Sequence, residues 1–202
     1  MAATRKLLVE GVDDLHVVYH LCGNNNVPSV FDVIDKKGID NLLDTISTEL
    51  KTSDLEALGI LVDADTDLHA RWQSLQTILQ REGYLVPYDP MPNGTILTHE
   101  EKPKVGIWLM PNNQLPGMLE NFVAMLIPNG DTLWPYAQTC LQQIPEQRFS
   151  NNIRAKANIH TWLAWQAEPG KPMGQAITAR YLNPGSQEAI WFVNWLQELF
   201  VE

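Results

Sequence analysis

Two short apolar runs that end in acidic residues constrain the fold of this chain most strongly. One run covers residues 7–10 and ends at Glu10, and the other covers residues 58–62 and is followed by Asp63. Apolar runs of this length beside glycine are typical of buried parallel strands. In open α/β sheets, ligands bind beyond the carboxyl ends of such strands. We therefore expect Glu10, Asp63 and Asp65 to meet in one crevice at that edge.

The rest of the chain alternates strand-like and helix-like segments. Further strands are expected over residues 30–34 and 105–110, whereas the prolines of residues 84–103 predict a long loop with a hairpin at Gly94. Helical spacing of apolar residues predicts helices over residues 13–21, 39–50, 68–81, 118–126, 132–143, 153–166 and 188–200. This order predicts an α/β fold, a Rossmann-like core with a central mostly parallel sheet flanked by helices, followed by a C-terminal helical extension.

The acidity of the chain is uneven. A length of 202 residues suits a single domain, and the net charge of −10 is carried entirely by residues 1–101. Residues 144–181 hold more bases than acids. We expect this basic stretch to face the acidic crevice, as a site for a phosphate-bearing substrate requires.

Targeting signals are missing from the sequence. It has no charged-then-apolar leader and no run of eighteen apolar residues, so neither export nor membrane spanning is expected. Cys22 and Cys140 lie far apart and form no CxxC motif, which is typical of reduced core thiols. These features predict a cytoplasmic protein without a membrane partner.

The acidic residues are spaced as metal ligands would be. Glu10 and Asp14 are four residues apart at the start of a predicted helix, so both carboxylates can face the same crevice. Asp63 and Asp65 would lie on one side if the strand continued in extended form, and Asp67 is expected to cap the next helix. Carboxylates crowded together repel one another unless a hard cation neutralises them, so we expect Mg²⁺ or Mn²⁺.

The order strand-Glu10-Gly11-x-x-Asp14, helix, strand, helix, strand-Asp63-x-Asp65 resembles the TOPRIM domain of topoisomerases, bacterial primases and OLD-type nucleases. The resemblance covers about residues 5–127 and leaves about 128–202 as the helical extension. The extension is similar to that of stand-alone TOPRIM-like proteins of unassigned function.

The resemblance implies roles for individual residues. By similarity to the OLD nucleases, Glu10, Asp14, Asp63 and Asp65 would be metal ligands or bases. Glu120 would be a later acidic ligand, and Lys156 a cation near the scissile phosphate. The expected function is a divalent-metal-dependent phosphoryl-transfer protein, namely a nuclease-type phosphodiester hydrolase with Glu10 and Lys156 as catalytic residues.

Two departures from these relatives bear on the partners. The chain has no Gly-rich Lys-Ser/Thr loop, which predicts that a separately encoded ATPase supplies that function. Its fourteen basic residues are few for duplex DNA, although nucleic acid remains the expected substrate class. The tryptophan-rich helix over residues 188–200 is a candidate face of a homodimer.

Other interpretations stay open from the sequence. Asp63 and Asp65 also fit the nucleophile strand of haloacid-dehalogenase-like phosphatases, and Asp13, Asp14 and Asp63 fit a response-regulator receiver. A non-catalytic module that binds a metal or nucleotide is the main alternative to an enzyme.

The histidines raise a further alternative. His16 and His20 lie four residues apart and would share a helix face with Asp13, which is a spacing compatible with zinc. His160 follows Lys156 at the same spacing and is a candidate general acid or base. A structural role is favoured for all three histidines.

Overall fold

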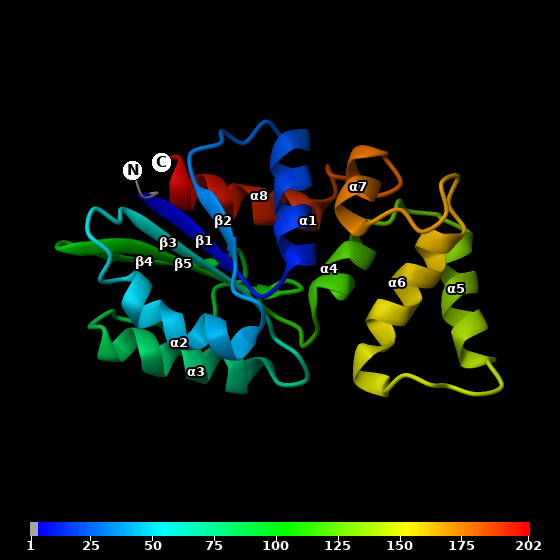
Figure 1. The fold of residues 1–202 in the computed structure, drawn as a ribbon, viewed down its shortest axis with the longest axis horizontal. Helices are drawn as coiled ribbons and strands as arrows, with labels where there is room; N and C mark the ends of the chain where they lie inside the picture. The colour runs from blue at the N-terminus through cyan, green and yellow to red at the C-terminus, as the bar shows by residue number, and fades with distance from the viewer. Residues whose placement is uncertain (1–3) are drawn as a thin grey trace.

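The computed structural model describes residues 4–202 and contains a five-stranded sheet with the strand order β2-β1-β3-β5-β4 (Figure 1). The four strands β1, β2, β3 and β5 pair in parallel, and β4 pairs with β5 antiparallel. The strands are β1 (Arg5–Val9), β2 (Asp32–Asp35), β3 (Ala57–Asp63), β4 (Thr95–His99) and β5 (Lys102–Met110). The expected α/β fold with a mostly parallel sheet is confirmed.

Helices cover both faces of this sheet, because successive strand residues point to opposite sides. Leu7 and Val9 pack with α1 and α8 in one hydrophobic cluster, whereas Leu8 packs with α2 and α3 in a second. These helices are α1 (Val12–Asn24), α2 (Ile39–Glu49), α3 (Leu68–Arg81) and α8 (Gln187–Phe200).

The remaining helices lie beyond the carboxyl ends of the strands, and those after residue 127 belong to the extension (Figure 1). They are α4 (Leu119–Met125), α5 (Leu133–Gln142), the 3-10 turn η1 (Asn151–Ile153), α6 (Arg154–Ala164) and α7 (Met173–Thr178). Ala137 of α5 and Trp162 of α6 are fully buried in the same hydrophobic cluster as β1. The extension therefore shares its packing with the sheet.

The loop expected over residues 84–103 is wrong in its second half, which contains β4. Along β4 the side chains alternate, with Thr95 and Leu97 buried and the last two residues exposed, which is the pattern of an edge strand. The hairpin turns between β4 and β5, several residues beyond Gly94. The prolines before this strand obscured a signal that is only five residues long.

One helix differs from expectation, and another bears on the expected homodimer. The six-residue α7 was not predicted, because it is too short to show helical periodicity and depends on packing against α1. A Cβ on Gly174 of α7 would lie 2.8 Å from the His16 carbonyl oxygen, so only glycine permits this approach. The α8 helix, the candidate face of a homodimer, buries most of its apolar residues against the sheet and leaves Ile190 and Trp191 partly exposed.

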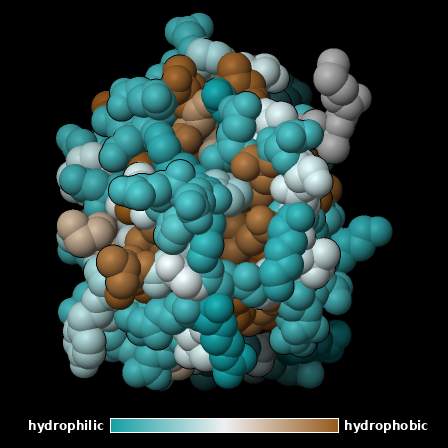
Figure 2. Space-filling model, turned by 90° about the vertical axis from the view of Figure 1, so that its left-hand side faces the viewer, coloured by the Kyte–Doolittle hydropathy of each residue, from teal (hydrophilic) through white to brown (hydrophobic). Residues whose placement is uncertain are grey.

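Charged side chains near the amino-terminal ends of the strands pair with one another. Arg5 contacts Glu56 at 2.8 Å, and Lys6 contacts Glu49 at 2.8 Å. Hydrophilic residues cover most of the face in Figure 2, which is the left-hand side of Figure 1, where both termini lie. These ion pairs neutralise charges at the amino-terminal ends of the strands.

None of the helices described within residues 4–202 has the length and apolar character needed to cross a lipid bilayer.

Candidate metal centre

Four carboxylates from four separate elements gather at the carboxyl edge of the sheet. Glu10 directly follows β1, Asp14 lies in the first turn of α1, Asp63 ends β3, and Glu120 lies in the first turn of α4. The parallel register pairs Val9 with Leu61, which brings the ends of β1 and β3 together. Asp14 and Glu120 are only 8% and 5% exposed, which is rare for acidic side chains.

Backbone amides hold one oxygen of three of these carboxylates. The Asp63 N–H donates to Glu10 Oε1 at 2.7 Å, and the Leu119 N–H donates to Asp63 Oδ1 at 2.9 Å. The Gly11 N–H donates to Asp14 Oδ2 at 3.0 Å, which also caps α1. Because each of these bonds occupies a single oxygen, the second oxygen of each carboxylate stays available for a ligand.

Burial and mutual repulsion raise the proton affinity of the cluster. Burial, followed by the nearby Glu10 and Asp14 carboxylates, raises the pKa of Asp63 to about 9. Burial and the Glu10 carboxylate raise the pKa of Asp14 to about 7. The pKa of Glu10 is also raised, mainly by burial, although the Asp63 amide and the Arg71 guanidinium oppose this effect. A bound cation would oppose these shifts, because its positive charge favours the ionised carboxylates.

Lys156 is the cation nearest to the buried part of the cluster. Its Nζ lies 3.3 Å from Glu120 Oε1 and 4.0 Å from Asp13 Oδ2, and its side chain is about half exposed. Glu120 and Lys156, whose roles the resemblance implies, are thus in contact. Lys156 of α6 is the residue of the basic stretch that contacts the acidic cluster.

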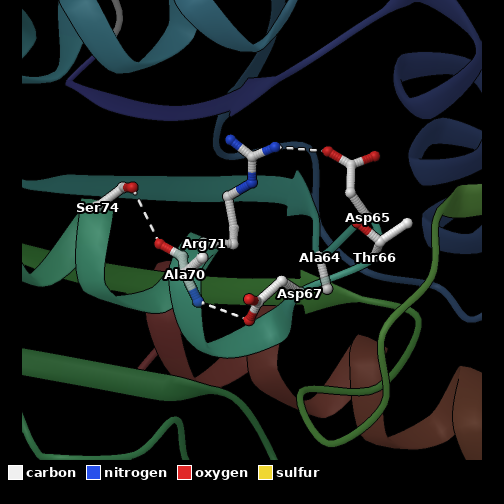
Figure 3. A pocket seen from close by; sticks show the side chains of 7 residues that line it. All are labelled: Ala64, Asp65, Thr66, Asp67, Ala70, Arg71 and Ser74. Atoms are coloured by element: carbon white, nitrogen blue, oxygen red, sulfur yellow. Dashed lines mark hydrogen bonds and ion pairs between the residues drawn. The ribbon is translucent and has the colours of Figure 1, made fainter.

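The Asp65 carboxylate is paired with Arg71, although its charge still contributes to the raised pKa of Glu10. The strand ends at Asp63, and Asp65 adopts a left-handed backbone with φ of 53° while its N–H donates to the Gly117 carbonyl at 2.8 Å. Its carboxylate pairs with Arg71 at 2.6 Å (Figure 3). The expected extended continuation of the strand is therefore wrong, because this bridge to Gly117 turns the chain.

The neighbouring residues of this turn behave differently. Asp67 caps α3 as expected, with its Oδ1 accepting from the Ala70 N–H at 3.0 Å (Figure 3). Arg71 was not anticipated as part of the site, yet it also donates from Nε to the Asp63 carbonyl at 3.0 Å. The sequence could have indicated this role, because Arg71 lies one helical turn after the cap Asp67 and its side chain can therefore reach back to the loop before the helix.

The carboxylate cluster is open. Among residues 4–202, no three His, Cys, Asp or Glu side chains lie in an arrangement that could hold a metal ion. Mg²⁺ usually keeps several waters and takes only one or two protein carboxylates, so an oxygen-rich open cluster suits it. Glu10, Asp14, Asp63 and Glu120 offer the carboxylate oxygens that such a cation prefers, although no three of them are arranged as its ligands in this structure.

The surroundings of two histidines bear on the alternative roles considered for them. His20 Nδ1 lies 2.7 Å from the Thr178 hydroxyl of α7, and burial together with His16 lowers the pKa of His20. His160 is exposed on α6. These positions favour the packing role for His20 that was expected from the sequence.

Comparison with known proteins gives one match. A family model described as a protein of unknown function, DUF3226, matches residues 4–201. Neither the curated proteins nor the solved structures contain a match to the chain.

Proposed function

The chain belongs to the DUF3226 family, described as proteins of unknown function, and we propose that it is a divalent-metal-dependent phosphodiester hydrolase of the nuclease type. The observation that carries the proposal is the set of buried, mutually repelling carboxylates, several of which are held by backbone amides. Such groups are costly to bury and have no evident role in packing. Their cost is offset if they bind a cation.

The residues of the cluster would have separate roles in metal binding and proton transfer. Glu10, Asp14, Asp63 and Glu120 would hold Mg²⁺ or Mn²⁺, with Asp65 joining them if Arg71 releases it. The ion would act as a Lewis acid toward a phosphate oxygen. Glu10 would accept a proton from the attacking water, because the raised pKa of its carboxylate increases its affinity for a proton.

Hydrolysis would form a new bond between the water oxygen and phosphorus and break one P–O ester bond. The products are a phosphate monoester and a free hydroxyl. The ammonium of Lys156, on the rim beside Glu120, would bind a non-bridging phosphate oxygen and stabilise the charge that develops there. The TOPRIM resemblance of residues 5–127 supports these assignments.

The proposed partners follow from charge and motifs. We propose nucleic acid as the substrate class and a separately encoded ATPase as a partner, since the chain lacks a phosphate-binding loop of its own. We place the activity in the cytoplasm, where the free thiols of Cys22 and Cys140 are chemically suited. A homodimer through α8 would use Ile190 and Trp191, the partly exposed residues of that helix.

A second function has its own support. No three His, Cys, Asp or Glu side chains within residues 4–202 are arranged to hold a metal ion, and a site that is not assembled for catalysis is consistent with a module that binds a metal or nucleotide without turnover. Such a module would need the carboxylates for affinity only, so the two functions differ in catalysis and share the metal.

The decisive experiment measures cleavage of plasmid DNA and single-stranded oligonucleotides with Mg²⁺ or Mn²⁺. The variants are Glu10→Gln, Asp63→Asn and Lys156→Gln, and the control is Asp44→Asn, an exposed acid on α2. We expect metal-dependent cleavage that falls at least about 100-fold in the three site variants and is unchanged in the control.

Calorimetry with Mg²⁺ alone separates the alternatives. Metal binding that Asp63→Asn abolishes, without cleavage of any substrate, would support the non-catalytic module. Absence of both binding and cleavage would contradict the metal centre itself.

A further inference from the structure

A polar groove lies beside the carboxylate cluster and has a volume of about 500 Å³. It is bounded by the loop after β3, the loop before α4, and η1 with the start of α6. Asp65 and Gly117, which are joined by a backbone hydrogen bond, form the wall nearest the metal centre. The groove adjoins the proposed site, because Asn121 and Ala155 in its lining are the chain neighbours of Glu120 and Lys156, and it is large enough for a small-molecule ligand.

The groove carries one cation without an acidic partner. Arg154 donates to Gln147 Oε1 at 2.7 Å and to Asn151 Oδ1 at 3.4 Å, and within residues 4–202 it pairs with no carboxylate. Its nearest companions are neutral amides. In a protein of net charge −10, such a guanidinium favours an anionic ligand.

Asparagine side chains line the rest of the groove. Asn158 has a buried Oδ1 without a hydrogen-bond partner in the described chain. Asn121 is fixed in place because its Oδ1 accepts from the Met118 N–H at 3.0 Å. Amide groups both donate and accept, so they match the hydrogen-bonding edges of nucleobases as well as the sugar and phosphate oxygens.

We propose that this groove binds one unpaired nucleotide next to the scissile phosphate, which makes the substrate a single-stranded nucleic acid. Arg154 binds the phosphate of that nucleotide, and Asn158 contacts its base. The inference rests on the proposed function and names its substrate class. A single strand fits because its bases are accessible, and because the acidic amino-terminal half offers few contacts for the phosphates of a second strand.

The test is fluorescence anisotropy with labelled single-stranded DNA, single-stranded RNA and duplex DNA of one sequence. It is done with Mg²⁺ in the Glu10→Gln background, which keeps the oligonucleotide intact. Arg154→Gln is expected to weaken single-strand binding about tenfold and to reduce the salt dependence by about one phosphate contact. Arg154→Lys should restore part of the affinity.

The matched control is Arg148→Gln. Arg148 lies in the same basic stretch, but it is 83% exposed and pairs with Glu146, so the affinity should change less than about twofold. Asn158→Ala should weaken binding of the intact oligonucleotide and leave binding of one with an abasic site at that position unchanged. The DNA and RNA arms identify which single strand is bound.

The outcomes separate the two proposals. If the wild-type protein cleaves single strands and Arg154→Gln keeps the wild-type Kd and KM, the groove assignment is overturned and the proposed function stands. If binding depends on Arg154 while no metal supports cleavage by the wild type, the proposed function fails and the groove remains as a binding site. Duplex binding at least as tight as single-strand binding, or no binding at all, overturns the inference.

Discussion

The carboxyl group of Asp63 shows how strongly the environment acts on a single residue. It lies at the end of a buried strand and accepts one backbone N–H, and burial, followed by the nearby Glu10 and Asp14 carboxylates, raises its pKa to about 9. In the unfolded chain the same group would ionise near its ordinary value of 3.8. Folding without a cation therefore favours the protonated acid.

This difference gives a pH-dependent prediction. Above about pH 4 the folded state binds more protons at Asp63 than the unfolded state, so the stability of the metal-free protein falls as the pH rises toward 9. Asp63→Asn keeps the acceptor for the Leu119 N–H and removes the charge. We expect it to raise the free energy of unfolding at pH 8 in EDTA by about 1–3 kcal/mol, with a smaller gain near pH 4.

Urea unfolding at both pH values, with and without Mg²⁺, provides the measurement. Mg²⁺ should stabilise the wild type and have little effect on Asp63→Asn, because binding to the folded state alone is what stabilises. If Asp63→Asn is less stable than the wild type at pH 8 in EDTA, the Asp63 carboxyl group does not destabilise the metal-free folded state and the prediction is wrong.

At the scale of elements, two glycines on neighbouring strands decide where α8 packs. Gly59 of β3 and Gly106 of β5 are direct partners in the parallel register. A Cβ at Gly59 would lie 2.6 Å from Leu7 Cδ1 and 2.9 Å from Phe200 Cζ, and one at Gly106 would overlap Leu199. The pair forms a flat patch on the sheet that receives the end of α8.

Alanine at this patch should be costly. Gly106→Ala is expected to lower the free energy of unfolding by about 1–3 kcal/mol, because Leu199 is 2% exposed and has little space to move. Gly23→Ala is the matched control, since Gly23 lies in α1 with nothing within 4 Å of an added Cβ. That change should be neutral or stabilise by about 0.5 kcal/mol. Chemical denaturation of both variants measures the contrast, and equal effects would contradict the role of the patch.

At the scale of the whole molecule, the carboxyl-terminal helix completes a core that begins in β1. Phe192, Trp195, Leu196 and Phe200 of α8 share a hydrophobic cluster with Leu7. Arg5 also donates to the Phe200 carbonyl, which links the two ends of the described chain. The sheet therefore lacks one covering layer until its last helix is in place.

A chain that ends at residue 186 is accordingly expected not to fold. Removal of α8 would expose the sheet face that it covers, a loss greater than the roughly 5–15 kcal/mol of stability typical of a domain. Near-UV circular dichroism and limited proteolysis would show the loss of fixed packing. Deletion of the exposed Val201 and Glu202 alone serves as the control and should leave the fold intact. A stable, protease-resistant chain ending at residue 186 would refute this prediction.

Periodicity and charge in the sequence predicted most of the architecture. The apolar runs at residues 7–10 and 58–62 were sufficient to locate two parallel strands, because a buried strand needs an unbroken apolar stretch whatever surrounds it. The expected meeting of Glu10 and Asp63 follows from the same logic, since neighbouring parallel strands end at one edge. The edge strand β4 and the short helix α7 could not be predicted from the sequence pattern, because tertiary contacts stabilise them more than their local sequence does.

The sequence by itself determined the α/β fold and the identity of the acidic residues at the edge of the sheet. Only the tertiary structure decided that Glu120 and Lys156 join that edge and that Asp65 turns toward Arg71. The physical reason is distance along the chain. Strand and helix patterns are set by neighbours a few residues apart, whereas a site assembled from β1, β3, α4 and α6 exists only after packing has brought those elements together.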